Sequence, residues 1–475
     1  MTQIHDLTVT EQAAAIRTGE TSSAEITEHY LDRIDRLNEQ VGAFYTVTHD
    51  LAREQAAAAD KAVLASRRDG AELPPLTGVP IPIKDLNMVA GVRFTLGSTV
   101  FADNVATEDD YVVEHLRSAG IVITGKTATP EFGLPPYTET RIGPPARTPW
   151  DLTRSAGGSS GGAAAAVSAG LAPAAQGSDG GGSIRIPSSV CGLFGIKPTR
   201  GRISHGPLVP DLAGLSTDGP LARTVADAAL LLDAMTGNHP GDMYTLPPLP
   251  AGESFLGYAR REPGRLRIGR SLKTIVDGAE VHADCVAAYE DASALLAELG
   301  HEVEDFDPPF PAEAVPSFLA LWYAMATLAP IAPDQEAQLL PLTRYLRAKG
   351  LELSATELFF HQAVLQGSVR AFMQALTGYD AILTPTLALP PRPVGWFDEV
   401  EPTENFVRQT MFTPWTALNN ISGQPAVSVP LHWSADGLPI GVMLAGQMGA
   451  EGTLISLSAQ LESARPWQDR HPPIW

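Results

Sequence analysis

The sequence predicts an α/β fold. Capped amphipathic segments with apolar residues at helical spacing occur along the chain, together with short β-branched runs bounded by glycine or proline. A helix is followed by a strand in the N-terminal part, and strands are followed by a helix near the C-terminus. A chain of 475 residues accommodates two or three domains, or one large α/β domain with an insertion.

The N-terminal elements begin with a helix. Residues 22–25, Ser-Ser-Ala-Glu, are typical of a capping box. Apolar residues follow at helical spacing, namely Ile26, Tyr30, Leu31, Ile34 and Leu37. Residues 76–84 form a β-branched run interrupted by prolines, which predicts a strand that is not fully paired. Residues 107–110 begin a second helix that ends at Gly120, and residues 121–124 predict the strand after it.

Later elements continue the pattern. A helix begins at Thr224 and ends before Gly237, while residues 426–430 and 440–444 predict strands ahead of a final helix around 454–461. Between these, residues 240–393 contain proline clusters and long helical stretches, with the apolar segment 318–330 among them. We expect this region to be a mainly helical insertion over the α/β core.

Composition limits the partners. The formal net charge is −21 and no Lys/Arg cluster is present, which argues against nucleic acid or an anionic membrane and favours small neutral or apolar substrates. Cys191 and Cys285 are too few for a disulfide framework and predict small buried residues in a reducing compartment. No secretion signal and no run of about 18 apolar residues is visible. We therefore expect a cytoplasmic protein.

Two motif matches lack the required context. Residues 120–127 fit G-x-x-x-x-G-K-[ST], but a P-loop lies between a strand and a helix, and here a helix comes first. Residues 158–162 fit G-x-S-x-G, yet the turn-like, polar residues 149–154 occupy the place of the strand that a nucleophile elbow needs. A Ser-His-Asp esterase, with His205 or His432 as the base, stays open as an alternative.

A third cluster predicts acyl-transfer chemistry. In Gly180, Gly181 and Gly182, successive N–H groups can converge as an oxyanion hole, and Ser183 at their edge is placed as a nucleophile. This stretch contains no histidine to act as a base. Ser159 belongs to a second glycine–serine cluster that a short helix connects to the first, so a hairpin could bring the two serines together.

A buried lysine could then be the ultimate base. Lys84 ends the apolar run 79–83, and strand alternation directs Asp85 to the opposite face. To act as a base near pH 7, Lys84 needs a pKa that is roughly 3 units below its ordinary value of about 10.4. This shift costs about 4 kcal/mol, which desolvation would supply. The alternative is that the glycines serve helix–sheet packing and that Lys84 is an ordinary strand-end lysine. Asp179 and Arg185 are expected to form a structural ion pair.

These residues carry a family resemblance. Residues 157–162, 177–185 and 78–85 resemble the core and lysine motifs of the amidase signature family. Further similarity covers residues 125–127, 187–202, 379–386 and 422 onward. The resemblance implies a single α/β/α domain over residues 1–475, with a mixed twisted sheet flanked by helices and residues 240–393 as a divergent insertion over the active site.

The resemblance also implies roles. The catalytic lysine falls on Lys84, the bridging serine on Ser159 and the acylated serine on Ser183; the oxyanion donors fall on the backbone of residues 180–183. Gly180 departs from relatives that carry a threonine or a bulkier residue. Residues 134–139 also depart, and Tyr137 is a candidate for substrate contact.

The implied reaction is hydrolysis of an acyl C–N bond through an acyl-enzyme on Ser183, without metal or organic cofactor. Aryl amides, nylon-type amides, carbamates and carboxamides all fit as small-molecule substrates. We expect no nucleic-acid or membrane partner, while a homodimer is possible. An alternative is the amidotransferase subunit that resembles this family and delivers ammonia to misacylated tRNA within a complex.

Overall fold

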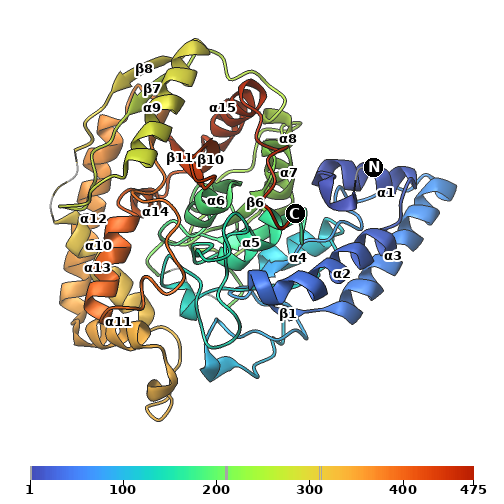
Figure 1. The fold of residues 1–475 in the computed structure, drawn as a ribbon, viewed down its shortest axis with the longest axis horizontal. Helices are drawn as coiled ribbons and strands as arrows, with labels where there is room; N and C mark the ends of the chain where they lie inside the picture. The colour runs from blue at the N-terminus through green and yellow to red at the C-terminus, as the bar shows by residue number, and fades with distance from the viewer. Residues whose placement is uncertain (1–2, 209–211, 310, 312) are drawn as a thin grey trace.

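The computed structural model describes residues 3–208, 212–309, 311 and 313–475, and it confirms the predicted α/β fold (Figure 1). A mixed sheet runs through the molecule, and its pairs are antiparallel except for the parallel pairs of β7 with β8 and with β9. Its strands, in spatial order, are β4 (Ala174–Ser178), β6 (Asp218–Ala222), β5 (Phe194–Lys197), β10 (Ala426–Trp433), β11 (Pro439–Gly446), β9 (Ala381–Pro385), β7 (Arg267–Arg270) and β8 (Glu302–Asp305).

Helices cover both faces of this sheet because the buried side chains alternate along its strands. Val427 and Val429 of β10 face a large core shared with α7 (Val225–Met235), α9 (Ala283–Glu298) and α15 (Glu451–Ala464). Ala426 and Met443 face the other side, where they pack with Trp415. The helices on that side are α5 (Gly161–Ser168), α6 (Arg185–Cys191) and α14 (Thr416–Ser422).

A smaller sheet lies in the N-terminal part, in the order β1 (Phe44–Val47), β3 (Gly125–Thr127), β2 (Ile83–Lys84). The strand predicted at residues 121–124 is wrong in position: Val122 forms only an isolated bridge with Pro80. The register changes by one residue between this bridge and the pair of Ile83 with Lys126, which interrupts the ladder over residues 123–124. The run 76–84 is accordingly only partly paired, as predicted.

The predicted helix starts are confirmed. Glu25 N–H donates to Ser22 Oγ at 3.0 Å, although the Glu25 carboxylate accepts from the Thr21 hydroxyl, so the box is only half formed. Thr224 caps α7 in the same way, through Asp227 N–H. The N-terminal helices are α1 (Val9–Thr18), α2 (Ser23–Val41), α3 (His49–Asp69) and α4 (Tyr111–Ser118).

Residues 240–393 do more than cover the core. They supply β7, β8 and β9, which form one edge of the central sheet, as well as several helices. These helices are α8 (Phe255–Tyr258), α9, α10 (Ala314–Ala326), α11 (Pro341–Glu352) and α12 (Ala355–Ala375). Helices α10 to α12 and the later α13 (Pro402–Phe412) lie together on the side of the molecule opposite α1 to α3 (Figure 1).

Short 3-10 helices complete the structure at Ile4–Asp6, Thr99–Phe101, Glu131–Gly133 and Glu336–Gln338. Cys191 and Cys285 are both buried and unpaired, as expected. Among the described helices, none has the length and apolar character needed to cross a membrane.

Candidate active site

The end of β2 is held against the start of the glycine-rich loop by Gln176 of β4. Lys84 N–H donates to Gln176 Oε1 at 2.8 Å, and Gln176 N–H donates to Pro82 O at 3.2 Å. The small sheet is thereby joined to the edge strand of the large one. This contact places the Lys84 side chain beside Ser159 and Ser178.

The Lys84 amine is fully buried and bonded to serine oxygens. Its Nζ donates to Ser159 Oγ at 2.8 Å, to Ser178 Oγ at 3.0 Å and to Ser178 O at 3.3 Å. Burial lowers the pKa of Lys84 from its ordinary 10.5 to about 7, although the charges of Asp218 and Asp179 act in the opposite direction. Much of this lysine is therefore neutral near neutral pH.

Asp85 does not serve as the counterion of Lys84. Its Oδ1 accepts from Lys126 Nζ at 2.9 Å, and both side chains are buried. Its Oδ2 accepts from the N–H and the hydroxyl of Thr95. The expectation that Asp85 faces away from Lys84 is confirmed. Lys126 is the lysine of the P-loop-like match. It lies on β3, whereas the lysine of a P-loop lies where a helix begins, so residues 120–127 do not form a P-loop.

The two serine clusters are in contact. The Gly158–Ser159 peptide bond is cis. Ser160 N–H donates to Ser183 O at 3.1 Å, which connects the loop before α5 to the loop before α6. The Ser160 hydroxyl is buried, where it donates to Ser178 O and accepts from Ser178 N–H. Ser160 therefore connects the two loops structurally.

The histidines proposed for the esterase alternative contact other groups. His205 Nδ1 lies 3.9 Å from Asp218 Oδ2, and His432 Nδ1 lies 3.6 Å from Asp291 Oδ2. Among the described residues, the Ser160 hydroxyl forms hydrogen bonds with backbone groups of Ser178 and with neither histidine.

A buried ion pair shapes the glycine loop, as expected. Asp179 accepts from Arg185 Nε at 3.0 Å and from Arg185 Nη2 at 2.9 Å. It also accepts from Gly182 N–H at 2.7 Å and Ile184 N–H at 3.1 Å. Arg185 holds the pKa of Asp179 well below its usual range, against the effect of burial. This carboxylate therefore fixes the backbone on both sides of Ser183.

The available oxyanion donors follow from this geometry. Gly182 N–H is engaged by Asp179, whereas the N–H groups of Gly180, Gly181 and Ser183 have no acceptor among the residues that the structure describes. Donors aimed at one point beside a nucleophile stabilise a developing oxyanion. Gly180, Gly181 and Ser183 are the candidates for this role here, and the contribution predicted for Gly182 stays a prediction.

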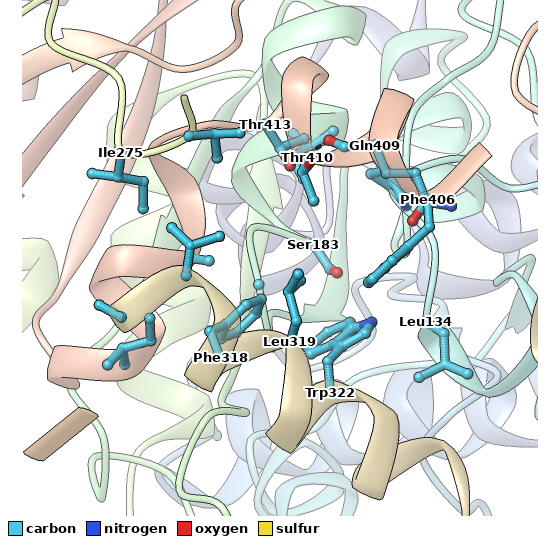
Figure 2. A pocket seen from close by; sticks show the side chains of 18 residues that line it. Leu134, Ser183, Ile275, Phe318, Leu319, Trp322, Phe406, Gln409, Thr410 and Thr413 are labelled. Atoms are coloured by element: carbon cyan, nitrogen blue, oxygen red, sulfur yellow. Dashed lines mark hydrogen bonds between the residues drawn. The ribbon is translucent and has the colours of Figure 1, made fainter. Parts of the chain in front are cut away.

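Ser183 opens onto a largely apolar pocket of about 710 Å³, its mouth included (Figure 2). The Trp322 ring lies against the glycines: a Cβ on Gly180 would be 3.7 Å from it and one on Gly181 3.4 Å. A larger side chain at position 180, as relatives carry, would therefore lie beside the Trp322 ring. Helices α10 and α13 supply much of the lining, with Phe318, Leu319, Trp322, Phe406, Gln409, Thr410 and Thr413.

The structure places Tyr137 outside the lining of this pocket. Tyr137 is buried, stacks on Phe397 at 4.5 Å between ring centroids, and donates from its hydroxyl to Asp398 Oδ1 at 2.6 Å. It lines a separate cavity with residues that include Glu139 and Asn405. Its contact with substrate stays a prediction.

Sequence reasoning missed Ser178 and the α13 residues. Ser178 lies inside the glycine–serine motif, directly before Asp179, and this position was the available signal. For Phe406 and Gln409 no signal was available, because nothing in the sequence connects residues 402–412 to the loops at 157–162 and 177–185.

No metal-binding group of three or more His, Cys, Asp or Glu side chains is found in the described ranges. The fold and the serine–lysine cluster point to a class of enzymes: hydrolases that act on the C–N bonds of amides. The chain belongs to the amidase family, because the family model described as Amidase matches residues 25–455.

Relatives agree over the whole chain. A putative amidase, AmiB2, of Mycobacterium tuberculosis (strain H37Rv) is 40% identical over 98% of this chain and 97% of its own. The 6-aminohexanoate-cyclic-dimer hydrolase of Paenarthrobacter ureafaciens is 35% identical over 98% of this chain and 96% of its own. A solved structure of a 6-aminohexanoate cyclic dimer hydrolase superimposes with a TM-score of 0.89, 31% identity and full coverage of both chains. A solved structure of a bacterial aryl acylamidase superimposes with a TM-score of 0.87 and 25% identity, and the match covers 98% of this chain and 97% of the other.

Proposed function

We propose that this amidase cleaves small, neutral, largely apolar amides through an acyl-enzyme on Ser183, with Ser159 and Lys84 as the proton relay. The observation that carries the proposal is the contact between a fully buried Lys84 amine, with a pKa of about 7, and Ser159 Oγ at 2.8 Å. A lysine desolvated in this way can act as a base near neutral pH.

In the first half-reaction, Ser183 Oγ attacks the substrate carbonyl carbon while its proton passes to Ser159, whose own proton passes to Lys84. The carbonyl oxygen becomes an oxyanion that accepts from the candidate donors, the N–H groups of Gly180, Gly181 and Ser183. The C–N bond then breaks, and the relay returns a proton to the leaving nitrogen. In the second half-reaction, water attacks the acyl ester with the same relay, and the C–O bond to Ser183 breaks.

The substrate class follows from the pocket and from the relatives. Phe318, Trp322 and Phe406 form apolar walls that suit an uncharged acyl or aryl group. Relatives include hydrolases of 6-aminohexanoate cyclic dimer and an aryl acylamidase. Aryl amides and nylon-type amides are therefore the first candidates, ahead of carbamates and simple carboxamides.

We also propose a cytoplasmic location. Two buried, unpaired cysteines fit a reducing cytoplasm. The proposed chemistry uses the chain's own serines and lysine and calls for no cofactor. A homodimer remains part of the proposal and is tested by the mass of the protein in solution.

Ser183→Ala should abolish hydrolysis of any amide that the purified wild type cleaves, because the acylated oxygen is lost. Ser188→Ala is a matched control, since Ser188 lies on α6 and its buried hydroxyl has no hydrogen-bond partner among the described residues. A fluorophosphonate should label Ser183 in peptide mass spectrometry. A label on Ser160, or activity retained by Ser183→Ala, would refute the assignment; wild-type activity only with added protein partners would favour the amidotransferase-type subunit.

A further inference from the structure

Gln409 is a polar side chain in the largely apolar pocket in front of Ser183. It lies on α13, is only 4% exposed, and lines the pocket together with Phe406 and Thr410 (Figure 2). Its Nε2 donates to Asn405 Oδ1 at 2.6 Å. Its Oε1 accepts no hydrogen bond from the residues that the structure describes.

A chain of hydrogen bonds fixes which end of this amide faces the pocket. Asn405 Nδ2 donates to Asp398 Oδ1 and to the Tyr137 hydroxyl, both at 2.8 Å, and the Tyr137 hydroxyl donates to the same carboxylate oxygen. A carboxylate accepts hydrogen bonds, so Asn405 must present its NH₂ group to Asp398. Asn405 Oδ1 then faces Gln409, which must present its own NH₂ group. The carbonyl oxygen of Gln409 is left for the pocket.

The neighbouring threonines also present oxygen atoms, rather than donor groups, to the pocket. Thr410 Oγ1 donates to Val407 O at 2.8 Å, and Thr413 Oγ1 donates to Gln409 O at 3.0 Å. Both hydroxyl protons are used within the helix, so the oxygens offer lone pairs to the pocket. The side-chain oxygens of Gln409, Thr410 and Thr413 are thus available to the pocket as acceptors.

We propose that Gln409 Oε1 accepts a hydrogen bond from an N–H or O–H group of the substrate outside the scissile bond, so that the enzyme selects uncharged amides carrying such a second donor. This inference rests on the proposed attack by Ser183. A substrate without the donor leaves a carbonyl oxygen desolvated and unpaired, and one with an acceptor or a carboxylate there is repelled. Asp398 and Asn405 act as positioning residues, through Gln409.

The test compares two anilides. One carries a secondary amide N–H in its acyl chain, and the other has that nitrogen methylated. The ratio of their kcat/KM values, N–H over N-methyl, should be about tenfold in favour of N–H for the wild type, as expected for one buried hydrogen bond. Gln409→Met keeps a similar side-chain volume without the acceptor, and it should bring the ratio close to one.

Two further variants sharpen the result. Val407→Ala alters the same helix at a position 42% exposed, and it should keep the wild-type ratio. Asp398→Asn removes the group that fixes the direction of both amides, so the ratio should fall as it does for Gln409→Met. A ratio near one in the wild type, or a tenfold ratio kept by Gln409→Met, overturns the role of Gln409. Hydrolysis of neither anilide would instead refute the proposed function itself.

Discussion

Lys84 is the residue whose protonation state decides the proposed chemistry. A charged amine cannot accept the proton of Ser159, and burial keeps a large fraction neutral because the pKa falls to about 7. Its possible counterion, Asp85, is already paired with Lys126. The neutral lysine thus depends on two features, desolvation and the diversion of a neighbouring carboxylate.

The rate should follow this titration. With a neutral substrate, kcat/KM should rise about tenfold per pH unit below pH 7 and level off above it, because the neutral amine is the active form. Lys84→Ala should lower kcat/KM near neutral pH by several orders of magnitude and remove the inflection. A wild-type profile that is flat from pH 5 to 9 would contradict the base assignment.

The residues of the proposed relay could be named from the sequence because they lie in or beside compact glycine–serine motifs. Lys84 and Ser159 are brought together as expected, and Asp179 pairs with Arg185. The sequence could not show which N–H groups of the glycine loop are available as oxyanion donors, since this depends on the hydrogen bond from Gly182 N–H to Asp179. Gln409 could not be found either, because its orientation results from contacts with side chains far along the chain.

At the scale of elements, α5 packs unusually close to its neighbours. A Cβ on Gly162 would lie 2.2 Å from Ala128 N and 2.5 Å from Ala43 O, both backbone atoms. The helix that separates the two serine loops therefore lies directly against the small sheet. This close approach explains why glycine, which is unfavourable inside helices, occurs there.

Two helix glycines make a matched pair. Gly162→Ala should destabilise the fold by several kcal/mol, since backbone must move to admit the methyl group. Gly367→Ala on α12 has open space around it and should stabilise the protein by roughly 0.5–1 kcal/mol. Urea unfolding of both variants measures the difference. Equal changes in the free energy of unfolding would show that the close packing around Gly162 does not contribute to stability.

Helix starts could be predicted from capping residues, as Ser22 and Thr224 show. The strand at residues 121–124 was misplaced because apolar character does not reveal the change of register between the Pro80–Val122 bridge and the pair of Ile83 with Lys126. The strands β7 and β8 were missed within residues 240–393, since each has only four residues and β8 lies at the edge of the sheet.

At the scale of the whole molecule, the net charge of −21 acts on any charged substrate that approaches. An amide ending in a carboxylate should show lower kcat/KM than one of equal size ending in a methyl ether. The deficit should shrink between about 0.01 and 0.1 M salt, where the Debye length falls from about 30 to 10 Å. A deficit independent of salt would place its cause inside the pocket.

The contact made by Gln176 has a consequence for how activity arises. Its side chain accepts from Lys84 N–H and donates to Asn87 and Asp218, so it fastens the small sheet to the large one at the site itself. The proposed base, Lys84, lies on β2 of the small sheet, and the proposed nucleophile, Ser183, follows β4 of the large sheet. We therefore expect a partly folded chain, in which only one of the two sheets has formed, to be inactive, and activity to arise only when Gln176 has joined them.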